Sequence, residues 1–413
     1  MERIWRASKP AHGEPGALRP DIQGLRGIAV LLVVLYHAGL PWLPGGYIGV
    51  DVFFVISGYL ITGMLVREVQ SNGRIDLPNF IARRARRLLP AALVLIGIVV
   101  GSSLAGGGGR GGGARGGWPC LAGTRGVRLS PPLERADIVS AARAAALYVA
   151  NLWFTVRAVD YLGGDAAVNP MLHMWSLGVE EQFYLLWPLL IGLAAYRTRG
   201  EAAVRRVWRM TLVVSVVSFV ACVWMTRTSQ PWAFFVTPFR AWEFGLGALA
   251  YLAGPRLQAA LAAWSQLAGW AGWAGAAAVV ASAFALGHHT LFPGPWALLP
   301  AGGTALVLFA LGAHQPARPG GMLRAALAFG PLARVGDVSY SWYLWHWPLI
   351  VMLPVLHPQA VPPRMLAAGG PVPPAPVGNF RLGGRPLRGP GAVPPPPRLS
   401  GQCPARQLPG RGL

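Results

Sequence analysis

The chain has 413 residues, of which 54% are hydrophobic and only 12% are charged, and its mean hydropathy is +0.44. A soluble protein of this length cannot bury so much apolar surface, and so apolar a chain does not stay disordered. The composition instead predicts an all-α, polytopic integral membrane bundle of about 9–11 transmembrane helices. The net charge of +21 does not indicate nucleic-acid binding, because the arginines lie between apolar runs, as the positive-inside rule predicts.

Apolar runs of membrane-spanning length follow one another along most of the chain. They cover 27–43, 47–66, 88–105, 174–196, 210–226, 233–254, 262–287, 295–313 and 338–357, with 138–157 as a weaker candidate that Arg143 and Asn151 interrupt. Basic loops at 1–26, 67–87 and 197–209 are predicted to face the cytoplasm, which makes the N-terminus cytoplasmic. No cleavable signal is evident in the basic N-terminal segment.

Two segments break this pattern. Residues 106–135 begin with GGGGRGGGARGG, which encodes neither helix nor strand, and 358–413 are rich in proline and glycine and contain no acidic residue. The first segment is either a flexible outer loop or a frameshift in a GC-rich gene, and we favour the frameshift. The second is predicted to be a disordered tail with the same possible origin. The membrane domain is then 1–357.

The cysteines give no sign of a metal centre. Cys120, Cys222 and Cys403 form no CxxC pair and no zinc-like spacing. We therefore predict neither a bound metal nor a disulfide framework.

Histidines and an arginine inside apolar runs are candidates for function, because ionisable groups in a membrane are costly. Arg26 and His37 are eleven residues apart, about three helical turns, so they share one face of a helix. A neutral His37 could take a proton from a substrate hydroxyl, and the alternative is a buried histidine bonded to a carbonyl. His173 lies at the outer edge of another run. His346 lies among aromatic residues and suits packing as well as catalysis.

Charged pairs at helical spacing form a second group of candidates. Arg84 and Arg87 share a face and could clamp phosphates, although a positive-inside stop signal also explains them. Glu180 and Glu181 enter an apolar helix, so at least one of them must line a cavity or pair with a cation. Glu180 and Tyr184 are four residues apart and share a face.

For three further ionisable residues, a structural role is the favoured interpretation. Asp51 suits an ion pair or a helix start, and Arg240 and Glu243, three residues apart, are predicted to neutralise each other. Ser57 and Gly58 suit close helix packing. Ser57 could act as a nucleophile only with a base, and the sequence around it offers none.

At these residues the sequence closely resembles the bacterial membrane acyltransferase-3 family, the O-acetylases of cell-surface glycans. Six segments carry the resemblance in family order: RPDIQGLRGIAVLLVVLYHAG (19–39), GGYIGVDVFFVISGYLIT (45–62), FIARRARRLLPA (80–91), NPMLHMWSLGVEEQFYLLWP (169–188), FRAWEFGLG (239–247) and VGDVSYSWYLWHWP (335–348).

The resemblance implies a membrane O-acyltransferase that moves an acetyl group from acetyl-CoA, or another acyl-CoA, to a hydroxyl of a cell-surface glycan or glycolipid. The implied roles are a general base at His37, a cofactor-binding motif arginine at Arg26, and site-lining acids at Glu180 and Glu181. Arg84 and Arg87 are implied to hold the phosphates of acyl-CoA.

The chain departs from the family pattern at several points. Gln23 stands where the family often has Asp, and the last family helix is absent after His357. Similar members carry an extracytoplasmic SGNH-type domain after the helices. We therefore expect the chain to be truncated before such a domain, which a separate SGNH-type partner would have to supply.

The expected location is the bacterial cytoplasmic membrane, with the chain crossing the lipid bilayer several times. Two other hypotheses stay open: a polytopic transporter of an acyl or glycan intermediate, and an inactive frameshifted remnant of the enzyme. Inverted repeats would favour a transporter, and the sequence shows none. The sequence does not choose among lipopolysaccharide, peptidoglycan, exopolysaccharide and a small glycoside as the acceptor.

Overall fold

The computed structural model describes residues 19–105, 132–160, 169–260, 265–287, 289–312 and 319–356. Every regular element in these ranges is helical, which confirms the predicted all-α class. The predictions for 106–135 and 358–413 lie outside the described residues, except that 132–135 begin a helix.

The helices of the N-terminal half match the predicted apolar runs at most positions. They are α1 (Pro20–His37), α2 (Gly49–Asn72), α3 (Leu77–Ala105), α4 (Pro132–Ala146), α5 (Ala150–Asp160) and α6 (Met174–Ala194). The weak candidate at 138–157 is divided between α4 and α5. Tyr148 lies between them with φ at 55°, in the left-handed region where a helix cannot continue.

The C-terminal half is helical as well. Its helices are α7 (Gly200–Thr228), α8 (Gln230–Phe235), α9 (Thr237–Ala260), α10 (Ser265–Ala285), α11 (Leu298–Gly312), α12 (Pro319–Leu327), α13 (Gly330–Asp337) and α14 (Ser339–Leu356). The predicted run at 338–357 therefore agrees with α14 to within one residue at each end.

Five segments in the described ranges are long and apolar enough to cross a membrane. They are Gly46–Asn72, Leu77–Leu104, Gly200–Thr228, Gln266–Ala285 and Gly294–Gly312. Helices α1, α6, α9 and α14 have 18 to 24 residues, and these four carry most of the polar candidates.

The outer surface of α7 is suited to lipid. Val213, Val217, Val220 and Trp224 recur every three or four residues, and each side chain is more than half exposed. Residues at this spacing form one face of a helix, and an apolar stripe of this kind marks a contact surface. With five span-length helices, this surface indicates a multi-pass membrane protein.

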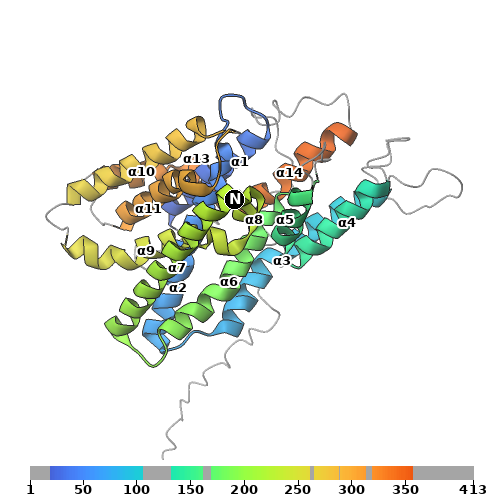
Figure 1. Cartoon of the computed structure of the whole chain (residues 1–413). Coiled ribbons are helices and arrows are strands. Elements are labelled where there is room, and N and C mark those ends of the chain that lie inside the picture. The colour runs from blue at the N-terminus through green and yellow to red at the C-terminus, as the bar shows by residue number, and fades with distance from the viewer. Residues whose placement is uncertain are drawn as a thin grey trace, which may run out of the picture.

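Helix α2 lies inside the bundle and packs against α1, α9 and α6 (Figure 1). Helices α10 and α11 pack together at one edge of the bundle, and α3 and α4 pack together at the opposite edge. The contact between α2 and α9 is close. A Cβ atom at Gly58 would lie 1.9 Å from the carbonyl oxygen of Phe244, and one at Gly247 would lie 1.9 Å from that of Val55. The small residues thus let α2 and α9 approach, as predicted for Gly58.

Candidate active site

Two pockets open beside α2. The arginine pocket, of about 110 Å³, is lined by Arg26, Ser57, Arg84, Arg87, Glu180 and Glu181, among others. The histidine pocket, of about 280 Å³, is lined by His37, Tyr47, Asp51, His173, Arg240 and Trp347, among others. Val50 and Tyr343 line both pockets, so a single layer of side chains separates them.

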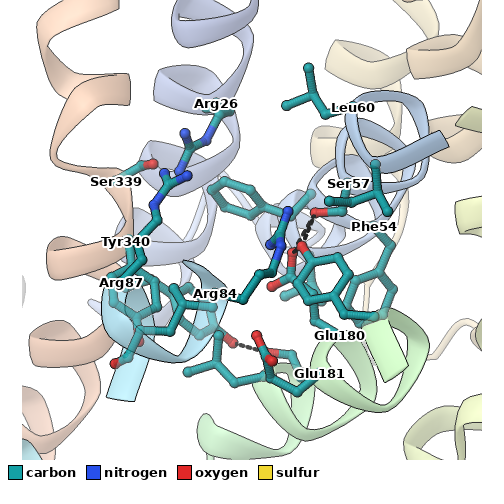
Figure 2. A pocket seen from close by; sticks show the side chains of 18 of the residues that line it. Arg26, Phe54, Ser57, Leu60, Arg84, Arg87, Glu180, Glu181, Ser339 and Tyr340 are labelled. Carbon is teal, nitrogen blue, oxygen red and sulfur yellow. Dashed lines mark hydrogen bonds between the residues drawn. The ribbon is translucent and has the colours of Figure 1, made fainter. Parts of the chain in front are cut away.

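The arginine pocket gathers three guanidinium groups. Arg26 comes from α1, while Arg84 and Arg87 come from the first turns of α3, and all three side chains point into the pocket (Figure 2). The predicted shared face of Arg84 and Arg87 is confirmed. Among the described residues, none of the three forms an ion pair. Three cations without paired carboxylates suit an anionic ligand, and guanidinium groups bind phosphate bidentately.

Gln23 holds the side chain of Arg26 at the arginine pocket. The Arg26 Nη1 atom donates a hydrogen bond of 3.0 Å to Oε1 of Gln23. The Gln23 amide in turn donates a 2.8 Å hydrogen bond to Oδ1 of Asp337 at the end of α13. Gln23 therefore links α1 to α13 and orients the guanidinium toward the pocket.

Both acids of α6 line the arginine pocket, which confirms that at least one of them borders a cavity. Glu180 accepts hydrogen bonds from the hydroxyls of Ser57 and Tyr184, so the predicted shared face of Glu180 and Tyr184 is also confirmed. The Arg84 guanidinium lies 3.9 Å from the centre of the Tyr184 ring. The carboxylate beside Ser57 comes from another helix, which is why the local sequence gave no sign of it.

His37 and His173 line the histidine pocket, and the ring of His346 packs against both of them. Nδ1 of His37 lies 3.1 Å from Nε2 of His346, and the His173 ring centre lies 5.7 Å from that of His346. Nδ1 of His346 lies 2.6 Å from the carbonyl oxygen of Tyr343, and Trp347 packs edge-on against His37 at 4.7 Å between ring centres. Sequence reasoning singled out each histidine but did not pair His37 with His346, 309 residues away.

Tyr343 is a residue that sequence reasoning missed. Its hydroxyl lies 2.5 Å from Oγ of Ser176 and donates a 3.1 Å hydrogen bond to the carbonyl of His173. The tyrosine therefore connects α14 to the start of α6, and it lines both pockets. Its position three residues before His346, on the same helical face, is the signal that could have identified it.

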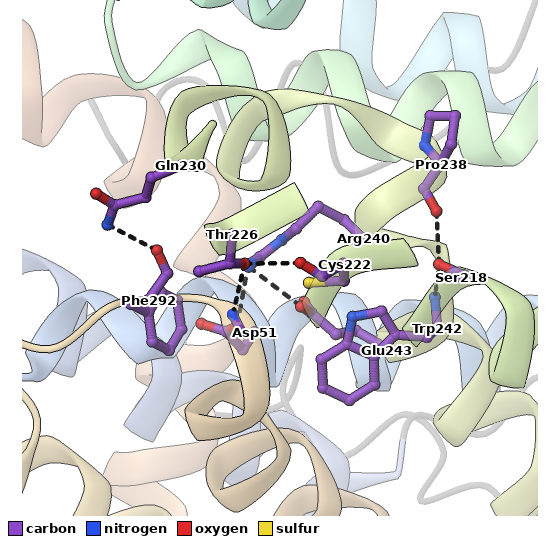
Figure 3. Close-up of polar contacts among 11 residues, drawn as sticks. Asp51, Ser218, Cys222, Thr226, Gln230, Pro238, Arg240, Trp242, Glu243 and Phe292 are labelled. Atoms are coloured by element: carbon purple, nitrogen blue, oxygen red, sulfur yellow. Dashed lines mark hydrogen bonds and ion pairs between the residues drawn. The ribbon is translucent and has the colours of Figure 1, made fainter. Parts of the chain in front are cut away.

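A buried ion-pair cluster borders the histidine pocket. Arg240 lies 3.0 Å from Oδ1 of Asp51 and 3.2 Å from Oε1 of Glu243 (Figure 3). All three side chains are at most 1% exposed. The predicted pairing of Arg240 with Glu243 and the ion-pair interpretation of Asp51 are both confirmed.

Within the described ranges, no group of three or more His, Cys, Asp or Glu side chains is arranged to hold a metal ion.

The fold and the two pockets define a multi-pass membrane protein with a cationic pocket beside buried histidines. The chain belongs to the acyltransferase-3 family, whose acyltransferase domain matches residues 19–365. No solved structure matches it significantly.

Curated relatives agree with this family. The chain is 30% identical over 342 residues to the O-acetyltransferase OatA of Staphylococcus aureus, which covers 81% of this chain and 51% of that protein. It is 31% identical over 349 residues to the peptidoglycan O-acetyltransferase OatA of Listeria monocytogenes, covering 82% and 50%. It is 30% identical over 349 residues to the putative peptidoglycan O-acetyltransferase YrhL of Bacillus subtilis, covering 81% and 49%. The chain thus spans about half the length of these relatives.

Proposed function

We propose that the chain is a membrane O-acetyltransferase that moves an acetyl group from acetyl-CoA to a hydroxyl of a cell-surface glycan. The observation that carries the proposal is the arginine pocket, separated by Val50 and Tyr343 from a pocket that contains His37. Two relatives whose names specify peptidoglycan favour that polymer as the acceptor.

The arginine pocket is the proposed donor site. Arg26, Arg84 and Arg87 fit the phosphates of CoA because their guanidinium groups line one pocket without ion-pair partners among the described residues. Acetyl-CoA would supply the acetyl group as an activated thioester. Arg84 and Arg87 follow the exposed turn at Gly73 and Arg74, which joins α2 to α3. The many arginines in 67–87 suit a location on the cytoplasmic side, where CoA is found.

The histidine pocket is the proposed acceptor site. The Tyr47 hydroxyl, Oδ2 of Asp51 and Nε of Arg240 are buried and have no hydrogen-bond partner in the part of the chain that the structure describes. Buried polar atoms are normally paired, so unpaired ones in a pocket suit a ligand rich in hydroxyls. Trp175 and Trp347 add aromatic surface to the same pocket, which suits the apolar face of a sugar ring.

His37 is the proposed general base. It would take the proton of the acceptor hydroxyl while the oxygen bonds to the acetyl carbon and the carbon–sulfur bond breaks. The proton then passes to the departing thiolate, so that free CoA and an O-acetyl ester are the products. Positioned proton transfer of this kind contributes about 10²–10⁴-fold to a rate.

CoA release tests the proposal directly. Membranes containing the chain are incubated with acetyl-CoA and peptidoglycan fragments, and free thiol is measured over time. We expect release by the unmodified chain and a fall of about 10²–10⁴-fold for His37→Ala. His289→Ala, at an exposed position between α10 and α11, is the matched control and should release CoA normally.

Two outcomes contradict the proposal in different ways. Equal release by His37→Ala and the unmodified chain would remove His37 as the base and keep the enzyme class. No release by the unmodified chain, with insertion confirmed, would favour a transporter or an inactive remnant.

A further inference from the structure

We propose that His346 is a positioning residue that fixes the tautomer of His37, so that Nε2 of His37 is the nitrogen that takes the substrate proton. This inference rests on the proposed function, since it assigns a role beside the proposed base. It is carried by the hydrogen bonds that join Tyr343, His346 and His37.

The contacts of His346 fix which of its ring nitrogens carries the hydrogen. Its Nδ1 lies 2.6 Å from the carbonyl oxygen of Tyr343, one turn earlier in α14. A carbonyl oxygen only accepts hydrogen bonds, so Nδ1 of His346 carries the hydrogen. In a neutral imidazole the other nitrogen then has a free lone pair, which makes Nε2 of His346 an acceptor.

The tautomer of His346 in turn determines the tautomer of His37. Nε2 of His346 lies 3.1 Å from Nδ1 of His37, which is hydrogen-bond distance. Because Nε2 of His346 is an acceptor, Nδ1 of His37 must be the donor. The lone pair of His37 then lies on Nε2. The opposite tautomer would bring two lone pairs together at this distance and leave both without a hydrogen.

The rings of His346 and His37 are held in place by tight packing. His346 is 7% exposed and packs against the rings of His173 and Tyr343, with ring centres 5.7 Å and 5.3 Å away. Tyr343 is fixed by its hydrogen bond to the His173 carbonyl, and Trp347 packs edge-on against His37. The orientation of the His37 ring is therefore set by α6 and α14 as well as by its own helix.

This geometry also assists the proton transfer. When Nε2 of His37 takes the hydroxyl proton, the ring becomes an imidazolium whose Nδ1–H donates a charge-assisted hydrogen bond to His346. That bond is stronger than the neutral one that preceded it, so it favours the protonated state of His37. His346 keeps its own proton on Nδ1 throughout, and the substrate proton leaves from Nε2 of His37 to the CoA thiolate.

Substitutions at His346 test the inference. The side-chain oxygen of His346→Gln can replace Nε2 as an acceptor, whereas His346→Leu keeps a similar volume and accepts nothing. We expect His346→Leu to lower kcat for CoA release by about 10–100-fold, the range known for partners that orient metal-binding histidines. His346→Gln should restore most of that loss. KM for acetyl-CoA should stay unchanged in both, because His346 does not line the arginine pocket.

A double variant separates positioning from general damage. In the His37→Ala background, His346→Leu should cause no further fall in residual release, because a residue that acts through His37 has nothing left to act on. Unaltered kcat in His346→Leu, equal impairment of the Leu and Gln variants, or losses that multiply in the double variant would each overturn the inference. Absence of release by the unmodified chain would instead overturn the proposed function, and this inference with it.

Discussion

Arg240 is buried between two carboxylates, Asp51 and Glu243, with side-chain exposure of 1% or less in all three. Removing the guanidinium would leave two acids buried without a cation, and breaking a buried pair in this way costs about 3–5 kcal/mol. We expect Arg240→Met to destabilise the detergent-solubilised protein by that amount, measured as a shift in its unfolding midpoint.

Glu243→Gln is the matched comparison, because it removes one acid and leaves a one-to-one pair of Arg240 with Asp51. This variant should unfold close to the unmodified protein. If both variants lose the same stability, the charge balance of the cluster is not what stabilises it.

Many of the individual site residues were predictable from the sequence, but the partners of those residues were not. The cost of placing ionisable groups in apolar helices identified Glu180 and His346 as separate candidates. Their partners come from other helices: Ser57 lies 123 residues before Glu180, and His37 lies 309 residues before His346. Pairing over such separations depends on how the helices pack, which a local pattern does not contain.

The contact of α2 with α9 depends on Gly58, where a Cβ atom would lie 1.9 Å from the Phe244 carbonyl oxygen. A backbone carbonyl cannot move aside without shifting its helix, and overpacking typically costs about 1–3 kcal/mol. Gly58→Ala should therefore lower the midpoint of thermal unfolding in detergent. Gly97→Ala in α3, where nothing lies within 4 Å, is the control and should be neutral or slightly stabilising. Equal effects at the two positions would argue against a close contact of α2 with α9.

Helix positions followed from apolar runs because a membrane span needs a fixed length of apolar chain. The run at 138–157 is an exception, because the structure divides it between α4 and α5. Its interruptions were visible in the sequence, but the break at Tyr148 depends on a left-handed backbone conformation that composition does not encode. The pairing of α4 with α3 likewise depends on tertiary contact.

For the whole molecule, the proposed orientation places the α2–α3 turn in the cytoplasm and the α1–α2 link outside. Trp42 is 57% exposed in that link, and Arg74 is exposed in the turn. In a background with Cys120, Cys222 and Cys403 replaced by serine, Trp42→Cys should react with a membrane-impermeant maleimide on intact cells. Arg74→Cys should react only after permeabilisation. The reverse pattern would invert the proposed orientation and place the arginine pocket on the wrong side for CoA.

Val50 and Tyr343 each touch both pockets, so the wall between the two chambers is one side chain thick. In the proposed reaction only a two-carbon group would have to pass this layer, while CoA would stay in the arginine pocket and the glycan in the histidine pocket. In the proposed reaction, the cell would keep its CoA inside and export only the acetyl unit. The thioester would then drive both the new ester bond and the crossing of the bilayer, without an ion gradient or ATP.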